Sequence, residues 1–142
     1  QPEKTEEASW YDDNGERWQR MGDIGRVDEE GFVTLLGRSK DMIISGGFNI
    51  YPRDLEDALL KQPEVVDAAV IGIPSKEWGE TPLGFVVAAG GETLDLPAVC
   101  ARANAELGKT QRISALKQLD ELPRSHIGKI LKTALREMVS ET

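Results

Sequence analysis

Apolar residues along the chain form short runs that indicate strands and spaced patterns that indicate helices. Val65–Pro74 and Leu83–Ala89 are nearly continuous apolar runs, which are typical of buried strands. From Pro52 to Leu60 apolar residues recur at helical spacing. Proline and acidic residues stand in the first turn, where they suit a helix. The pattern therefore predicts a helix over 52–60 followed by two buried strands.

Further helices and strands are predicted in the rest of the chain after residue 52. We predict a loop over 75–82, a helix over 96–107 ended by Gly108, a strand around 113–119 and a final helix over about 128–139. The order helix-strand-strand-helix-strand-helix indicates an α+β fold, with a small three-stranded sheet packed with helices.

The first 39 residues show a different pattern, which favours β-hairpins. Asn14-Gly15 lies between segments that carry aromatic residues and is a hairpin-turn signal. The β-prone runs 24–27 and 32–36 flank an acidic turn that ends in Gly31, which predicts a second hairpin.

Composition narrows the class of protein. The 142 residues carry a net charge of −8, which argues against a general nucleic-acid binder. Cys100 is the only cysteine, so no disulfide can form within the chain, and a reducing, cytoplasmic location is expected. No apolar run approaches the ~20 residues of a membrane-spanning helix. Because the chain starts at Gln1 without an initiator methionine, we expect a piece of a longer protein.

The stretch from Gly37 to Pro52 is the strongest candidate for a functional segment. A charged run, Arg38-Ser39-Lys40-Asp41, precedes the apolar pair Ile43-Ile44, and the adjacent Gly46 and Gly47 follow. Two adjacent glycines let the backbone take positive φ and approach a ligand closely. The pattern predicts a hinge that leads into a ligand-facing loop.

Two further motifs could meet a nucleotide. Lys129 follows Gly128 at the predicted start of the last helix, where it could bind an anion together with unpaired backbone N–H groups. A solvated lysine on that helix is the alternative interpretation. Gly22-Asp23 is a common turn pair, but its carboxylate could also accept hydrogen bonds from a diol such as ribose. Trp10, Trp18 and Trp78 are interpreted as packing residues.

Taken in order, these motifs resemble the adenylate-forming superfamily of acyl-CoA synthetases, luciferases and peptide-synthetase adenylation domains. The resemblance covers almost the whole chain and corresponds to the carboxy-terminal end of such an enzyme. It implies that 1–39 ends the large adenylation domain and that 40–142 is the mobile C-terminal domain. The residues that match the family's motifs are Asp23 and Arg38 for the nucleotide, Lys40 for the hinge, Ser45, Gly46, Gly47, Phe48 and Asn49 for the CoA-binding loop, and Lys129 for catalysis.

The resemblance also implies a reaction. A carboxylic acid is activated with ATP as acyl-adenylate, then transferred to CoA. ATP and Mg²⁺ are held mainly by the N-terminal adenylation domain, which is the expected partner, and no metal site is expected in this chain. The fragment alone is expected to be inactive, because the superfamily's phosphate loop and acyl pocket lie upstream.

Two other interpretations stay open at this stage. The chain could be a free-standing nucleotide- or CoA-binding adaptor module, or it could belong to a peptide-synthetase adenylation domain. In that second class the hinge residue is usually aspartate, whereas this chain has Lys40.

Overall fold

A computed structural model describes residues 6–140 of the protein, and the chain divides between Lys40 and Asp41 into two units. The first unit contains the two predicted hairpins, each an antiparallel pair. Asp12 organises the first turn: its side chain accepts hydrogen bonds from the backbone N–H groups of Asn14 and Glu16, each at 2.9 Å. The bond from Glu16 is the main cause of the lowered pKa of Asp12. The strands are β1 (Ser9–Tyr11), β2 (Arg17–Gln19), β3 (Asp23–Val27) and β4 (Val33–Arg38).

The second unit is built around a five-stranded sheet in the order β6-β5-β8-β7, with β9 also paired to β8. Its long central hairpin consists of β7 and β8, and β9 runs parallel to β8. The predicted α+β class is correct, but the sheet has two strands more than the three expected. The additional strands come from the segment that we interpreted as a loop. The strands are β5 (Ile43–Ser45), β6 (Phe48–Ile50), β7 (Val65–Ser75), β8 (Gly79–Ala88) and β9 (Ala115–Gln118).

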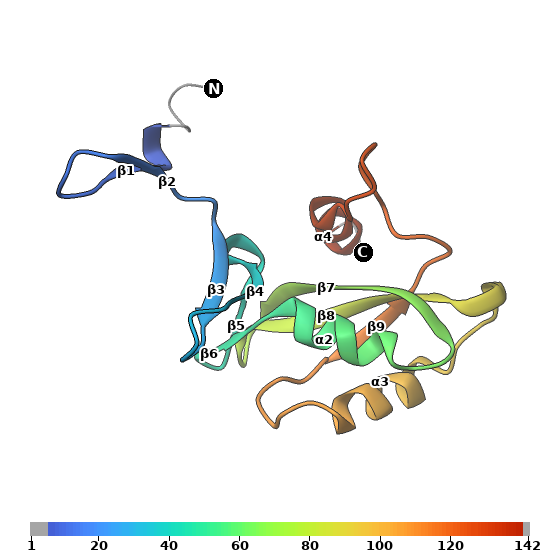
Figure 1. The fold of residues 1–142 in the computed structure, drawn as a ribbon. Coiled ribbons are helices and arrows are strands. Elements are labelled where there is room, and N and C mark those ends of the chain that lie inside the picture. The colour runs from blue at the N-terminus through green and yellow to red at the C-terminus, as the bar shows by residue number, and fades with distance from the viewer. Residues whose placement is uncertain (1–5, 141–142) are drawn as a thin grey trace. The chain divides into compact units, whose positions relative to one another are not determined.

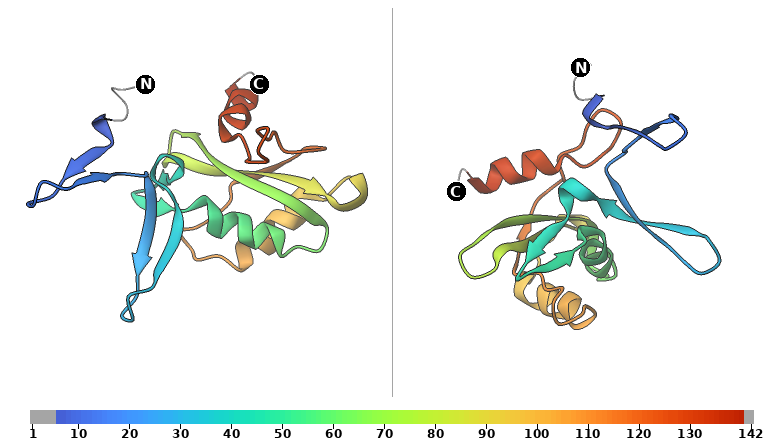
Figure 2. Two further views of the ribbon diagram at one scale, coloured as in Figure 1. Left: turned by 45° about the horizontal axis from the view of Figure 1, so that its top comes forward. Right: turned by 90° about the vertical axis from the view of Figure 1, so that its left-hand side faces the viewer.

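Helices cover both faces of this sheet (Figures 1 and 2). The helices α2 (Pro52–Leu60) and α3 (Leu96–Ala105) lie on one face, and α4 (Lys132–Ser140) lies on the other. The alternating side chains of β7 and β8 explain two separate cores. One contains Leu55, Leu59, Val70, Val86 and Val99, and the other contains Ala69, Ile71, Phe85, Leu122 and Leu135.

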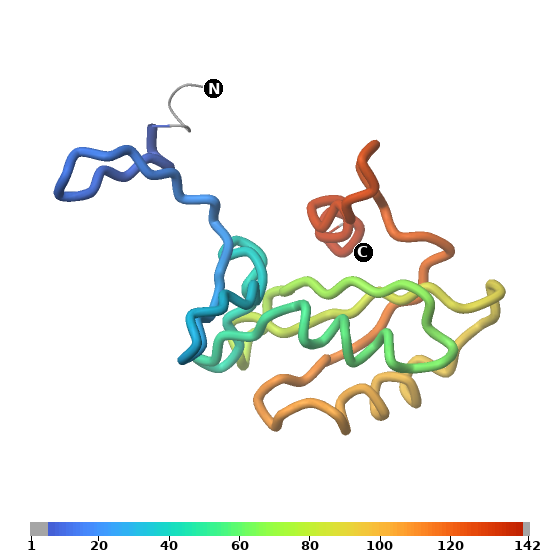
Figure 3. Tube along the Cα trace, viewed as in Figure 1, coloured from blue at the N-terminus to red at the C-terminus, as the bar shows by residue number. Residues whose placement is uncertain are grey.

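Several predicted boundaries need correction. The predicted loop over 75–82 is only a turn at 76–78, because 79–82 pairs with 72–75 and lengthens both strands. The helix expected over 96–107 ends at Ala105, and the strand expected around 113–119 is β9. The last helix begins at Lys132 rather than near Gly128, so 122–131 belongs to the connection from β9 to α4 (Figure 3).

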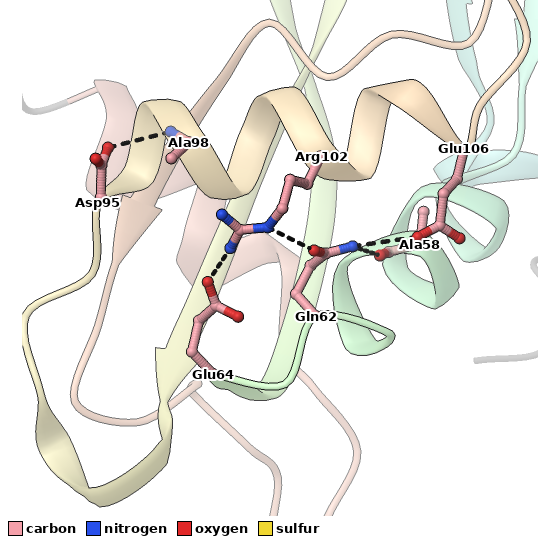
Figure 4. Close-up of polar contacts among 7 residues, drawn as sticks. All are labelled: Ala58, Gln62, Glu64, Asp95, Ala98, Arg102 and Glu106. Carbon is pink, nitrogen blue, oxygen red and sulfur yellow. Dashed lines mark hydrogen bonds and ion pairs between the residues drawn. The ribbon is translucent and has the colours of Figure 1, made fainter.

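The helices α2 and α3 are joined by a polar network centred on the buried side chain of Gln62, which is 5% exposed (Figure 4). Its amide nitrogen donates to the carbonyl oxygen of Ala58 at 3.2 Å and to Glu106 at 3.3 Å. Its amide oxygen accepts from Arg102 Nε at 3.0 Å, and Arg102 also pairs with Glu64. A buried amide with all these partners is stabilising, because none of its polar atoms loses hydrogen bonds on folding.

Candidate functional site

The double glycine forms the turn of the β5–β6 hairpin. Ser45 pairs with Phe48, so Gly46 and Gly47 are the two central residues of the turn. Their φ angles are +56° and +82°, and a two-residue turn of type I′ needs positive φ at both positions. The segment Ser45–Asn49, which we predicted to be a ligand-facing loop, is therefore the tip of a β-hairpin. The turn alone is sufficient to require both glycines.

Beside this hairpin tip lies a cavity of about 440 Å³. Phe48 and Trp78 line it, with 56% and 52% of their surfaces exposed. Lys109 and Arg112 line it as well, so the cavity combines aromatic faces with positive charge. Such a site can take a ligand that carries a ring and a phosphate.

Sequence reasoning missed most of this cavity. We interpreted Trp78 as a packing residue, whereas half of its surface is exposed and its ring lies against Gly46. The Gly46 N–H donates to the carbonyl oxygen of Trp78 at 2.9 Å, which ties the turn at 76–78 to the hairpin tip. Lys109 and Arg112 follow α3 in a short polar stretch, and their closeness in sequence was the available signal.

The contact with Trp78 distinguishes the two glycines and leads to a prediction. A Cβ on Gly46 would lie 2.8 Å from Trp78 Cε3, whereas nothing lies within 4 Å of a Cβ on Gly47. Both alanine variants should cost about 1–2 kcal/mol because of the positive φ. We expect Gly46→Ala to cost about 1–3 kcal/mol more, because the ring must move. Urea denaturation measures both. In a Trp78→Ala background the two variants should cost the same, and a difference that persists there would contradict the explanation.

Lys129 lies on an exposed turn, and not at the start of a helix as we predicted. Arg124 and Ile130 form an isolated β-bridge that closes this turn. Inside it the Ser125 N–H donates to the Lys129 carbonyl oxygen at 2.8 Å, and the Lys129 N–H donates to Ser125 Oγ at 3.2 Å. The Lys129 N–H is already bonded to Ser125 Oγ and does not belong to a helix. It therefore cannot help to bind an anion as a free N–H group at a helix start would. The exposed ammonium group of Lys129 remains for that purpose.

The charge environment sets Lys129 apart from its neighbours. Residues 122–140 contain four lysine and arginine side chains, and three of them have carboxylate partners. Arg124 pairs with Asp67, Lys132 with Glu56 at 2.7 Å and Arg136 with Asp41 at 3.3 Å. Within the described residues, no hydrogen bond or ion pair engages the Lys129 ammonium group. This positive charge is available to an anionic ligand.

Asp23 and Arg38 are brought together in the first unit. They are register partners at the ends of β3 and β4, and Arg38 Nε lies 3.0 Å from Asp23 Oδ1. Arg38 also donates to the carbonyl oxygen of Met21 at 2.9 Å. The Gly22 carbonyl oxygen accepts from the Ser39 N–H at 2.8 Å. The residues just before Asp23 are therefore also hydrogen-bonded to the segment that carries Arg38. The second carboxylate oxygen of Asp23 can accept from a ligand hydroxyl.

Lys40 is the last residue of the first unit and lies in the short 3-10 helix η1 (Ser39–Asp41). Within the described residues, no hydrogen bond or ion pair joins the hairpin tip to the Lys129 turn, although both belong to the second unit. Within the first unit, the structure thus brings Asp23 and Arg38 together.

In the part of the chain that the structure describes, no group of three or more His, Cys, Asp and Glu side chains could hold a metal ion. No helix there is long and apolar enough to cross a membrane. Burial raises the pKa of the half-buried Cys100 thiol, which makes it a poor nucleophile at neutral pH.

Known proteins with similar sequences give the family. The AMP-binding enzyme C-terminal domain family matches residues 54–129. A long-chain-fatty-acid–CoA ligase, FadD13 of Mycobacterium tuberculosis, is 41% identical over 99% of this chain and 27% of its own length. The 2-succinylbenzoate–CoA ligase of Bacillus cereus is 42% identical over 87% of this chain and 25% of its own length.

Solved structures agree with the sequence matches. The crystal structure of ATP-bound MatB from Rhodopseudomonas palustris has a TM-score of 0.83 and 39% identity, and the match covers 96% of this chain and 26% of MatB. The chain spans about a quarter of the length of these relatives. It therefore belongs to the AMP-binding enzyme C-terminal domain family, the C-terminal part of adenylate-forming acyl-CoA ligases.

Proposed function

We propose that this chain is the lid of an ATP-dependent acyl-CoA synthetase and serves two successive half-reactions. In the first, a carboxylate attacks the α-phosphate of ATP and releases pyrophosphate. In the second, the CoA thiol attacks the acyl-adenylate and releases AMP. The observation that carries this proposal is the uncompensated charge of Lys129, in a segment where the other lysine and arginine side chains are paired.

Adenylate formation brings two anions together, so it needs a cation more than it needs a base. Lys129 would contact the substrate carboxylate and the α-phosphate and stabilise the negative charge between them. A turn held by its own backbone hydrogen bonds suits this role, because preorganised charge requires no rearrangement during the reaction.

The nucleotide would meet this chain at Asp23. Its carboxylate would accept hydrogen bonds from the ribose hydroxyls, and Arg38 would fix the carboxylate and approach the same sugar. The Mg²⁺ that accompanies ATP would be held mainly by the N-terminal adenylation domain.

Thioester formation would use the other part of the second unit. The hairpin tip Ser45–Asn49 would line the path of the pantetheine arm of CoA, with open space beside the backbone at Gly47. CoA also carries an adenine ring and phosphates. The adjacent cavity, with Phe48, Trp78, Lys109 and Arg112, has suitable chemistry for these groups.

Rotation at Lys40 would exchange the two surfaces between the half-reactions. We further propose that the partner is the N-terminal adenylation domain of the same cytoplasmic protein. Without that domain the fragment is expected to be inactive and to bind CoA or AMP weakly or not at all.

The experiment that tests this function compares the full-length protein with the chain alone. A panel of short, long and aromatic carboxylic acids is supplied with ATP, Mg²⁺ and CoA, and acyl-CoA, AMP and pyrophosphate are measured. We expect equal amounts of the three products from the full-length protein and none from the chain. A full-length protein that forms acyl-adenylate but transfers it to an amine or a carrier protein in place of CoA would overturn the proposal.

A further inference from the structure

We propose that Arg124 and Asp67 form a clamp that positions the Lys129 turn for adenylate formation. This inference rests on the function proposed for Lys129. Arg124 and Asp67 are positioning residues in it, since they act on the reaction through Lys129.

The guanidinium group of Arg124 contacts two parts of the second unit at once. Its Nη2 donates to Asp67 Oδ2 on β7 at 2.5 Å, and its Nη1 donates to the carbonyl oxygen of Gly128 at 2.7 Å. Gly128 directly precedes Lys129. One planar side chain therefore connects the sheet to the peptide unit that carries the lysine.

The other bonds of the turn determine its shape but do not attach it to the sheet. Among the described residues, the hydrogen bonds of 124–129 stay inside the turn, except for the bond from Arg124 to Asp67. Beyond the turn the chain is anchored by the buried Leu122 on one side and, on the other, by Ile130, which packs against the same core, and by Leu135 in α4. Between Leu122 and Ile130, the clamp is the hydrogen-bonded link from the described turn residues to the sheet, and we expect it to set the direction in which the turn projects.

The position of Asp67 also supports this role. The register of β7 against β8 shifts between Val65 and Asp67, which is a β-bulge, and bulges redirect side chains beside functional sites. Asp67 Oδ1 accepts a hydrogen bond from the Ala68 N–H at 3.1 Å, so one carboxylate oxygen is held by the strand while the other meets Arg124. The bond to the Ala68 N–H thus helps to orient the carboxylate toward Arg124.

The ion pair between Arg124 and Asp67 is expected to contribute little to the free energy of folding. The side chains of Arg124 and Asp67 are 44% and 29% exposed, and ion pairs near the surface stabilise folded proteins only weakly. Geometry is the more sensitive quantity, because a displacement of about 1 Å in a catalytic group can cost roughly 10²-fold in rate.

The test uses Asp67→Asn and Arg124→Met in the full-length ligase. We expect acid-dependent ATP–pyrophosphate exchange to lose about 10- to 100-fold in kcat. The KM for ATP and thioester formation from supplied acyl-adenylate and CoA should stay unchanged. Arg124→Lys keeps the charge but not the fork, so it should recover only part of the rate. Asp57→Asn is the matched control, since Asp57 forms an exposed pair with Arg53 at 4.0 Å within α2.

Combining each substitution with Lys129→Ala separates positioning from a general structural role. If the clamp acts through Lys129, Asp67→Asn should cause no further loss of adenylate formation in the Lys129→Ala background. Additive losses there, or equal losses in both half-reactions of the single variants, would overturn the proposal.

A second measurement distinguishes failure of the clamp from failure of the proposed function. Trypsin cleavage after Lys129, measured by mass spectrometry on the full-length protein, should be several-fold faster in Asp67→Asn than in Asp57→Asn. Unchanged cleavage would overturn the clamp. Faster cleavage with full adenylation activity in Lys129→Ala would leave the clamp as a structural feature and overturn its role in the reaction together with the function proposed for Lys129.

Discussion

Replacing Lys129 with alanine in the full-length ligase is expected to lower the rate of adenylate formation by about 10²–10³-fold. The reason is electrostatic: the exposed ammonium group has no carboxylate partner among the described residues, and the attack brings a carboxylate to a phosphate. Acid-dependent ATP–pyrophosphate exchange measures this half-reaction alone. Thioester formation from supplied acyl-adenylate and CoA should keep its normal rate, because no second anion has to be brought to the phosphate in that step.

The control for this prediction is Lys61→Ala, which removes a lysine that pairs with Glu106 at 3.0 Å near the end of α2. It should leave both half-reactions unchanged. If Lys129→Ala lowered both half-reactions equally, the lysine would be serving the fold or the docking of the lid, and its assignment to adenylate formation would be wrong.

Elements whose signals are local could be predicted from the sequence. The helix α2 was predicted with its correct bounds, because Pro52, the acidic first turn and the apolar spacing all favour the same helix. Asn14-Gly15 and the acidic turn ending in Gly31 placed both hairpins of the first unit correctly. In each case the deciding chemistry lies within a few residues of the element it determines.

Errors arose where a local signal supports two structures. A double glycine suits a ligand-facing loop and equally a type I′ hairpin, and the second became apparent only when β5 was found paired with β6. Gly128-Lys129 also suits the start of a helix, but the bridge between Arg124 and Ile130 closes this segment into a turn, and α4 begins only at Lys132. Both structures depend on pairing with another segment of backbone. A pattern within one short segment does not show which partner that segment has.

The candidate site residues also divide into those that a local motif marks and those that depend on distant parts of the chain. Asp23, Arg38, Lys40 and Lys129 stand within recognisable motifs and could be proposed from the sequence. The partner of Arg124 lies 57 residues away on β7, so nothing near Arg124 in the sequence indicates Asp67. The surroundings of a catalytic side chain are thus harder to predict than the side chain itself, because they are assembled by the sheet.

Replacing Lys40 with proline is expected to have the opposite effect to Lys129→Ala. Lys40 ends the first unit in the 3-10 helix η1, and a hinge at this residue must adopt two backbone conformations. Proline restricts φ to about −65°, a value within the 3-10 range, so we expect one arrangement to be kept and the other lost. Adenylate formation should continue, and thioester formation should fall by about 10²-fold or more, the order of loss that misplaced reacting groups cause.

The matched variant Lys40→Ala removes the same charge but leaves the backbone free, so it should support both half-reactions. Stopped-flow measurement of acyl-CoA formation from supplied acyl-adenylate separates the two variants. Normal thioester formation in Lys40→Pro would show that the rotation takes place at another residue. Equal loss in Lys40→Pro and Lys40→Ala would instead assign the effect to the lysine's charge, since the two variants share that loss and differ in the freedom of φ.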